Sequence, residues 1–305
     1  MYDIRAATTA DIAPVVALMV RLQADDAHHI GYHGNTAEEI NELLLEFEPD
    51  WASGAVIAVD DGGRTRGVLS VETDHDVDRS WLHGPYVDVP ANHPAAAGLW
   101  HTTADALLAA ALRRRGTDDL ELYGHRDNRL LAEFAERHGF ANRGASRVFA
   151  LSGPALAEMV AGPPDSVRPL PDDQAVRDAV IALHERCFPH RTVSGQHLVD
   201  ARRDHTVVVQ GADGLVGYAA GFAQEAELYV DYVCVDEALR SVGAGRALVR
   251  GLVRELATRF GTREQAAAVV MVGNTASERM FTALGFDVLV ELVAYRRGNA
   301  APVPA

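Results

Sequence analysis

The sequence contains no lysine, so all 28 of its basic residues are arginines, against 43 acidic residues. The formal net charge at pH 7 is therefore −15. Such a chain repels phosphate backbones, because nucleic-acid binding depends on basic side chains that displace counterions. We expect no nucleic-acid partner, and we expect cationic small molecules or basic peptides to be attracted. Arginine alone, in a chain rich in alanine and glycine, is typical of a GC-rich bacterial genome.

Cysteine is also scarce. Only Cys187 and Cys234 occur, and they lie far apart in the sequence without the spacing of a metal site. This cysteine content favours a protein of the cytoplasm, where cysteines are kept reduced. No apolar run approaches the roughly 18 residues needed to span a bilayer, and the first residues lack the pattern of a targeting peptide. We expect a soluble cytoplasmic protein that has no membrane partner and binds no metal.

The 305 residues have the composition of an ordinary globular protein, 48% hydrophobic and 23% charged, and suffice for two domains. The second half repeats the first at an offset of 146 residues: Val89 and Val235, Asn128 and Asn274, and Gly139-Phe140 and Gly285-Phe286. We place the two domains at 1–152 and 166–297. Between them, Pro163 and Pro164 disfavour helix and indicate a linker.

Strand-like and helix-like segments alternate in the second copy. Segments rich in β-branched residues predict strands, and apolar residues at helical spacing predict helices. The expected strands are 206–209, 216–222, 227–235, 266–272 and 288–295, and the expected helices are 246–260 and 275–284. This order predicts a mixed α/β fold of the α+β class, with a hairpin region before a β-α-β crossover.

The most informative stretch follows the strand that ends at Val235. It has the pattern Arg-x-x-Gly-x-Gly-Arg, formed by Arg240, Gly243, Gly245 and Arg246. The glycines let backbone N–H groups approach an oxyanion, and the start of a helix and the arginines add positive charge. The pattern therefore indicates an anion cradle, although a tight strand-to-helix turn also needs glycine for steric reasons alone.

A second motif follows the cradle. It is Asn274-x-x-Ser277-x-x-Met280-Phe281-x-x-Leu284-Gly285-Phe286. Together the two motifs resemble the GNAT family of N-acetyltransferases, whose second motif reads Asn-x-x-Ala-x-x-Leu-Tyr-x-x-x-Gly-Phe. With both copies counted, the resemblance covers nearly the whole chain. It implies two tandem acyl-CoA N-acyltransferase (GNAT) folds, each a mostly antiparallel splayed sheet flanked by helices.

The resemblance implies acetyl-CoA as a cosubstrate. Backbone groups of the strand before the cradle would hold the pantetheine arm, the cradle would hold the pyrophosphate, and Asn274 would steady the arm from the other side. The residues implied to bind acetyl-CoA are Val233, Cys234, Val235, Arg240, Ser241, Val242, Gly243, Ala244, Gly245, Arg246, Asn274 and Phe281.

The resemblance also implies that an acceptor amine attacks the thioester directly, so a group must accept its proton. Strand alternation puts four side chains on one face: Glu227, Tyr229, Asp231 and Val233. Asp231 is the first candidate to accept the proton or bind the ammonium group, because an unpaired buried carboxylate is costly. A salt bridge to an arginine is the alternative, and Glu227 is the second candidate. Phe281 replaces the family's frequent tyrosine, so water or Tyr229 would protonate the leaving thiolate.

The first copy lacks the cradle. At the same offset it has Pro94, Ala97 and Leu99 in place of Arg240, Gly243 and Gly245, and a one-residue shift recovers only Gly98. On its strand, His83 and Tyr86 are the candidates for proton transfer, and a partly exposed structural histidine is the alternative for His83. We expect this domain to pack against the second one and shape the acceptor pocket, and its binding of CoA stays open.

Two further groups of polar residues are candidate sites. The first copy clusters Asp25, Asp26, His28, His29 and His33, which match no metal motif and predict a polar loop after a helix. In the second copy, 184–203 is where the family builds acceptor specificity. Its candidates are Cys187, Phe188, His190, His197 and Asp200, each with a structural role as the alternative.

The sequence thus predicts an enzyme, an N-acetyltransferase that transfers an acetyl group from acetyl-CoA to a primary amine of a small cationic molecule. Its active site is expected in the second domain. The alternative is a non-catalytic acyl-CoA-binding or scaffold protein of the same fold, favoured by Phe281 and the eroded first copy. Amine-dependent release of CoA separates the two, and the oligomeric state stays open.

Overall fold

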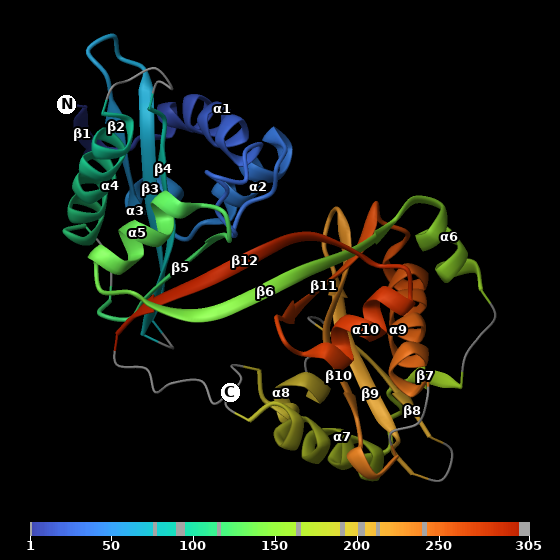
Figure 1. Cartoon of the computed structure of the whole chain (residues 1–305). Helices are drawn as coiled ribbons and strands as arrows, with labels where there is room; N and C mark the ends of the chain where they lie inside the picture. The colour runs from blue at the N-terminus through green and yellow to red at the C-terminus, as the bar shows by residue number, and fades with distance from the viewer. Residues whose placement is uncertain are drawn as a thin grey trace. The chain divides into compact units, whose positions relative to one another are not determined.

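The computed structural model (Figure 1) describes residues 2–75, 78–89, 95–114, 117–162, 166–189, 193–200, 205–211, 214–239 and 243–298. Contacts divide the chain into two compact units. Unit 1 comprises Met1–Ser146 and Glu291–Ala305, and unit 2 comprises Arg147–Val290.

Unit 1 is built on a mostly antiparallel sheet in the order β1-β2-β3-β4-β5-β12. Its elements are β1 (Asp3–Ala6), η1 (Thr9–Asp11), α1 (Ile12–Gln23), α2 (Ala37–Glu46), α3 (Trp51–Gly54), β2 (Ala55–Val59), β3 (Thr65–Asp74), β4 (Arg79–Val87), α4 (Ala96–Leu112), β5 (Leu120–His125), α5 (Arg129–Arg137) and the first part of β6 (Ala141–Ser152). β4 and β5 are parallel, and α4 supplies the crossover that parallel neighbours require.

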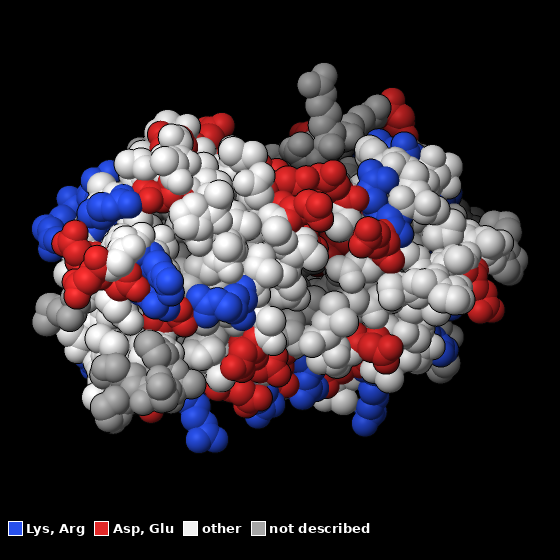
Figure 2. Space-filling model, turned by 90° about the horizontal axis from the view of Figure 1, so that it is seen from above, with Lys and Arg blue, Asp and Glu red and all other residues white. Residues whose placement is uncertain are grey.

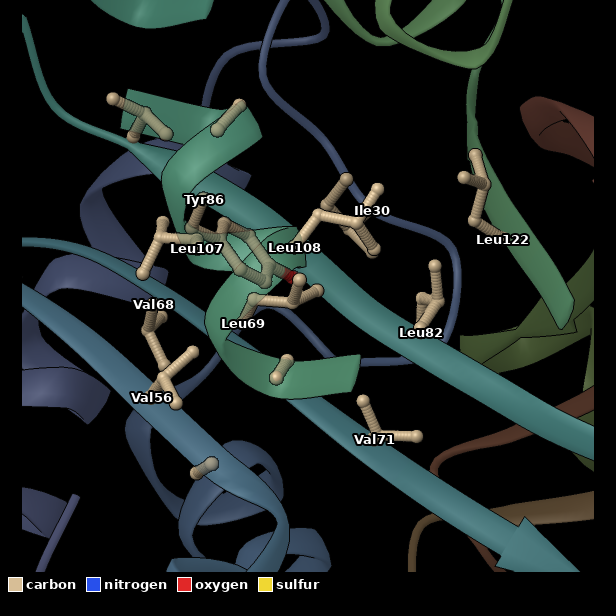
Figure 3. Packing of buried hydrophobic residues seen from close by; sticks show 14 of the residues in the cluster. Ile30, Val56, Val68, Leu69, Val71, Leu82, Tyr86, Leu107, Leu108 and Leu122 are labelled. Carbon is tan, nitrogen blue, oxygen red and sulfur yellow. The ribbon is translucent and has the colours of Figure 1, made fainter. Parts of the chain in front are cut away.

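The core of unit 1 lies between this sheet and its helices (Figure 3). Fully buried side chains of the strands meet those of α4, among them Leu69, Leu82 and Leu107. Ile30, from the connection between α1 and α2, is also completely buried in this cluster. A loop residue in the core shows that this connection is packed as firmly as the regular elements.

Unit 2 has the strand order β6-β11-β10-β9-β8-β7. Its elements are α6 (Gly153–Ala161), β7 (Val167–Pro169), α7 (Gln174–Cys187), α8 (Gly195–Asp200), β8 (Thr206–Gln210), β9 (Gly217–Ala223), β10 (Glu227–Val235), η2 (Glu237–Leu239), α9 (Ala244–Phe260), β11 (Gln265–Met271), α10 (Thr275–Ala283) and the first part of β12 (Asp287–Arg297). One core cluster packs the sheet against α9, and a second packs it against α7 and α8.

The strands and helices expected in the second copy are all present, with bounds that differ by at most two residues. Between the two copies, residues 153–161 form helix α6, an element that the sequence did not predict. Pro154 stands in the first turn of α6, where a missing N–H costs nothing, and Leu156 and Met159 are buried in the core of unit 2. Pro163 and Pro164 lie outside the described residues.

The last strand of each copy contributes to both units. The end of β6 brings Phe149 and Leu151 into the core of unit 2, and the end of β12 brings Val293 and Tyr295 into the core of unit 1. β12 pairs with β5 from Leu292↔His125 to Arg297↔Leu120. The compact units therefore differ from the sequence copies, whose boundaries at 1–152 and 166–297 stay a prediction.

An ion pair fastens the returning strand β12 in unit 1. Arg296 donates to both carboxylate oxygens of Asp119, with Nε at 2.7 Å from Oδ1, and these bonds lower the pKa of the Asp119 carboxyl. Both side chains are at most one-fifth exposed. Because the folded pKa is depressed, the pair stabilises the fold above the unfolded pKa of about 3.9. The stabilisation is lost as pH falls through the lower folded pKa.

We expect Asp119→Asn to lower the free energy of unfolding at pH 7 by about 1.5–3 kcal/mol, since a hydrogen bond to a charged group is broken. The deficit shrinks as the pH is lowered below 4. Urea unfolding followed by circular dichroism at several pH values measures both effects. Exposed Asp118 gives the matched control, Asp118→Asn. An equal loss in the control, or a deficit that does not change with pH, would contradict the assignment.

Candidate functional site in unit 2

Strand β10 separates from its parallel neighbour halfway along its length. It pairs with β11 from Glu227↔Gln265 to Val230↔Ala268, and no later pair joins these two fully described strands. On its other side β10 stays paired with β9 up to Val235↔Gly217. The splay that the resemblance implies is therefore present between Val230 and Val235.

A β-bulge lies where the splay begins. The register of β10 against β9 shifts between Val230 and Tyr232, which leaves Asp231 as the extra residue. Leu228 and Val230 face the α9 side, whereas Tyr232 and Cys234 belong to the cluster with α7. Simple alternation would have kept all four on one face.

The expectation of a single face is therefore wrong at the bulge. Val233 packs on the α9 side, while the Tyr229 ring contacts Phe222, which in turn contacts His205 on the side away from α9. The extra residue reverses the alternation after Asp231.

A pocket of about 1380 Å³ opens at the splayed end of β10. It gathers seven of the residues implied to bind acetyl-CoA: Val233, Cys234, Val235, Gly243, Gly245, Arg246 and Asn274. The end of α7 and helix α10 also contribute, with Arg186, Phe188 and Arg279. Two acidic residues that follow β10, Asp236 and Glu237, line the pocket as well. Arg240, Ser241 and Val242 lie outside the described residues.

The two cradle glycines are needed for different reasons. Gly243 is the N-cap of α9 with φ +112°, a left-handed conformation that favours glycine. Among the described residues, an added Cβ would meet only Arg246 Nη2, 3.9 Å away. At Gly245 an added Cβ would lie 2.7 Å from Met280 Sδ. Gly245 therefore permits close packing of α9 on α10, which supports the steric alternative at this position.

The start of α9 presents donors to the pocket. The first bond of the helix runs from Ala247 N–H to the Gly243 carbonyl at 2.9 Å, so the preceding N–H groups lie outside the helical ladder. These N–H groups form the positive end of the α9 helix dipole, and Arg246 lies beside them, so this place suits an anion. Ala244 is buried and does not line the pocket.

Asn274 caps helix α10, as its side-chain oxygen accepts from Ser277 N–H at 3.2 Å. Asn128 caps α5 of unit 1 in the same way, with Leu131 N–H at 3.0 Å. The repeated asparagines thus share a structural role. Phe281 is 3% exposed and its ring contacts those of Phe149 and Phe286, so it packs in the core instead of lining the pocket.

The three candidate catalytic residues lie earlier on β10 than the residues that line the pocket. Asp231 Oδ2 is 2.9 Å from His205 Nε2, a partner that the sequence reasoning missed. The Asp231 side chain is 25% exposed and that of His205 only 9%. Glu227 accepts from Gln265 Nε2 at 3.1 Å, in the paired part of the strand. Within the described residues, the hydrogen-bond partner of Asp231 is thus a histidine, whereas the alternative weighed was an arginine.

The cysteines contradict the expectation of two separate thiols. Cys187, at the end of α7, and Cys234, on β10, are joined by a disulfide and both line the pocket. No spacing rule pairs residues 47 positions apart, so the sequence held no signal for this bond. Phe188 also lines the pocket. Asp200 pairs with Arg177 on the surface, and His190 lies outside the described residues.

In unit 1 the corresponding splay is filled by the chain itself. β4 and β5 pair only at Ser80↔Leu120 and Trp81↔Glu121. Beyond that point, the connection after α1 bonds to β5: Gly31 N–H donates to the Tyr123 carbonyl at 2.8 Å, and Ile30 bridges Gly124. Buried Gln23 holds this connection through four hydrogen bonds. Main-chain groups of β5 that border this splay are thus already engaged by the chain.

The candidate residues of the first copy are buried and paired. His83 Nε2 lies 2.9 Å from Glu72 Oε2, and the Tyr86 hydroxyl lies 2.9 Å from His33 Nδ1. His83 is 4% exposed, so it is a buried residue and not the partly exposed one expected. Burial lowers the pKa of His33 well below its usual range, which keeps this imidazole neutral. Pro94 lies outside the described residues, and Ala97, Gly98 and Leu99 form the first turn of α4.

One group in unit 1 has the composition of a metal site. Asp26, from the polar cluster after α1, lies with His125 and Asp127, and an atom of each falls within 4.8 Å of the others. His125 Nδ1 accepts the Asp127 backbone N–H at 3.1 Å, so Nε2 carries the proton and faces Asp26 Oδ1 at 3.8 Å. Hydrogen bonding and charge account for this arrangement.

Acidic and basic side chains alternate in small groups on the face shown in Figure 2. Patches of both signs therefore occur on this face of an acidic chain. Within the part of the chain that the structure describes, no helix is both long enough and apolar enough to cross a bilayer.

Comparison with known proteins identifies this architecture. Residues 176–286 match the model of the acetyltransferase (GNAT) family. Among solved structures, a GCN5-related N-acetyltransferase from Sphaerobacter thermophilus is similar over 99% of this chain and 98% of its own, with a TM-score of 0.68 and 16% identity. No curated protein matches the chain.

Two further solved structures have the same fold. A tandem GNAT protein from the clavulanic acid biosynthesis pathway is similar over 99% of this chain and all of its own, with a TM-score of 0.57 and 16% identity. The glucosamine N-acetyltransferase region of a fungal multi-domain β-N-acetylglucosaminidase covers 97% of this chain, which spans 38% of that protein, with a TM-score of 0.61 and 15% identity. The GNAT resemblance and the tandem fold are thereby confirmed.

Proposed function

We propose that this protein is an acetyl-CoA-dependent N-acetyltransferase whose active site lies in unit 2, between the splayed ends of β10 and β11. The observation that carries the proposal is the coincidence of three features in one place. The splay begins after Val230, the pocket lies at its open end, and the start of α9 places N–H groups that precede the first helical bond beside that pocket.

The residues present fit the cosubstrate. Acetyl-CoA supplies an acetyl group activated as a thioester. The open space at Gly243 and the N–H groups at the start of α9 would bind its pyrophosphate, with Arg246 adding charge. The backbone of Val233 and Val235, unpaired toward β11, would bind the extended arm. Asn274 would contact the arm from α10 while capping that helix.

The pair of Asp231 and His205 is the proposed proton acceptor. Asp231 is the more exposed partner and sits at the bulge where the splay begins, so it is the group that would meet an ammonium ion or take its proton. His205 holds the carboxylate in place at 2.9 Å, and the added proton is shared across this hydrogen bond. The leaving thiolate takes its proton from water, because Phe281 has none to give.

The acceptor we propose is a primary amine of a small cationic molecule. A net charge of −15 raises the local concentration of cations, and Asp231 offers a partly exposed carboxylate beside the splay. The rings of Phe222 and Tyr232 contact His205, and the Tyr229 ring contacts Phe222, so aromatic faces that suit a cation lie beside the Asp231–His205 pair.

The competing proposal is a protein that binds acyl-CoA without turning it over. The buried Phe281, in the place of a proton donor, is the observation in its favour. Acetyl-CoA binding without amine-dependent CoA release, over a broad panel of amines, would establish the competing proposal.

We expect the protein to bind one acetyl-CoA per chain, because the splay in unit 1 is occupied by Ile30 and Gly31. Isothermal titration calorimetry measures the stoichiometry, and thiol-reactive detection of released CoA measures turnover with each amine. Two sites per chain would contradict the assignment of unit 1, and no binding at all would overturn the proposed function.

A further inference from the structure

The only two cysteines of the chain lie together in the pocket proposed for acyl-CoA. Cys187 and Cys234 are joined by a disulfide, with their Cα atoms 6.6 Å apart. Both belong to the pocket lining, which also includes Gly243 at the cradle and Asn274 at the start of α10. The reactive bond and the cradle are therefore parts of one cavity.

The two sulfurs differ in their surroundings. Cys187 is an exposed residue at the C-terminal end of α7. Cys234 is 5% exposed and packs in the cluster with Tyr218 and Tyr232. Because a thiolate must reach the sulfur that it attacks, a nucleophile in the pocket meets Cys187, and Cys234 is the leaving group.

The ligand of this pocket becomes a thiol when its acyl group is transferred. This step rests on the acyl-CoA part of the proposed function. Cys234 stands between Val233 and Val235, which are proposed to hold the pantetheine arm, and about 10 Å along the strand from Asp231, at roughly 3.3 Å per residue. A bound CoA thiol would share the cavity with the disulfide, and such confinement corresponds to an effective concentration of the order of millimolar.

We propose that the Cys187–Cys234 disulfide is a covalent capture site for CoA. The CoA thiolate attacks Cys187 Sγ, a mixed disulfide forms between CoA and Cys187, and the bond between Cys187 and Cys234 breaks. Cys234 leaves as a thiolate and takes up the proton that the CoA thiol gave up. One disulfide replaces another, so no further oxidant or reductant takes part. Acetyl-CoA has no free thiol and does not react.

Capture blocks the pocket with the product of the transfer. The adduct keeps CoA in the cavity where acetyl-CoA binds, so the captured protein is inactive until a small thiol displaces CoA. The reduced protein has no disulfide to exchange and is insensitive to this step. The inference therefore predicts inhibition by free CoA that builds up with time in the disulfide form only.

Intact-mass spectrometry of the disulfide form tests the proposal. The protein is incubated without reductant with CoA, acetyl-CoA or glutathione at equal concentrations, and then mapped by non-reducing peptide analysis. We expect a mass gain of one CoA on the peptide that contains Cys187, at least tenfold faster than with glutathione, and none with acetyl-CoA. Cys234→Ser, which leaves Cys187 as a free thiol, gains no CoA.

A second variant separates capture in the pocket from chance reaction at the surface. Gly243→Glu keeps the disulfide but places a carboxylate at the cradle, so the rate with CoA should fall to that with glutathione. Equal rates for CoA and glutathione in the unaltered protein, an unchanged rate in Gly243→Glu, or an adduct on Cys234 would each overturn the capture site.

The same samples distinguish this inference from the proposed function. Acetyl-CoA binding and amine-dependent turnover are measured on the reduced protein. Turnover without capture by the disulfide form removes the capture site alone. Capture without turnover removes the enzyme and leaves the capture site in place.

Discussion

Replacing Gly243 by Glu is expected to weaken acetyl-CoA binding at least 100-fold, which corresponds to about 2.8 kcal/mol. Two effects add at this position. Gly243 has φ +112°, which a residue with a side chain rarely adopts, and the new carboxylate would stand beside the N–H groups that are proposed to meet the pyrophosphate. Titration calorimetry of acetyl-CoA into the variant gives the affinity directly.

The other end of the same helix provides the control. Gly261 ends α9 with φ +86°, so Gly261→Glu imposes a similar backbone strain about 26 Å from the cradle, at 1.5 Å rise per residue. This variant should lose stability but bind acetyl-CoA within about twofold of the unaltered protein. Retained affinity in Gly243→Glu, or an equal loss in Gly261→Glu, would remove the cradle from the binding site.

Removal of the Asp231 carboxylate is expected to lower amine-dependent turnover by about 10²–10⁴-fold, the usual contribution of a general base. Because Asp231 does not line the pocket, the affinity of Asp231→Ala for acetyl-CoA should be unchanged. His205→Gln should reduce kcat as well, by a smaller factor, since the carboxylate remains but loses its partner at 2.9 Å. Steady-state kinetics on each variant, with calorimetry of acetyl-CoA, separate kcat from binding.

The matched control for this set is Asp287→Ala, which removes an exposed carboxylate at the first residue of β12. It should leave both kcat and affinity unaltered. Full turnover in Asp231→Ala would exclude Asp231 from the mechanism. A loss of acetyl-CoA affinity that parallels the loss of turnover would show that the residue supports the pocket and not the proton transfer.

The parts of the site that could be predicted are those formed by residues close together in the sequence. The cradle between β10 and α9 and the cap at Asn274 each depend on a few neighbouring positions, so their spacing alone predicted a strand, a turn and a helix in the right places. The duplication could be predicted from the sequence for the same reason, because its matching residues belong to short local motifs. Gly139 and Gly285 both end a helix with a positive φ, and each copy must supply that glycine independently.

The unpredicted features depend on residues that are distant in sequence. His205 meets Asp231 across 26 positions, Cys187 meets Cys234 across 47, and Arg296 meets Asp119 across 177. No local sequence pattern predicts these contacts, because the residues are brought together only when the sheet is assembled. The bulge at Asp231 belongs to the same class, since it is defined by the register against β9 and not by the strand itself.

By itself the sequence determined the two-copy GNAT fold and a strongly acidic chain, and it predicted an anion cradle in the second copy alone, because composition and short motifs are local properties. Only the tertiary structure decided which unit each last strand completes, what fills the splay of unit 1 and which residues accompany Asp231. The physical reason is that side-chain partners and strand registers are set by packing over the whole sheet. The same holds for the two cysteines. The sequence predicted that they are reduced, whereas the structure joins them in a disulfide that lines the pocket.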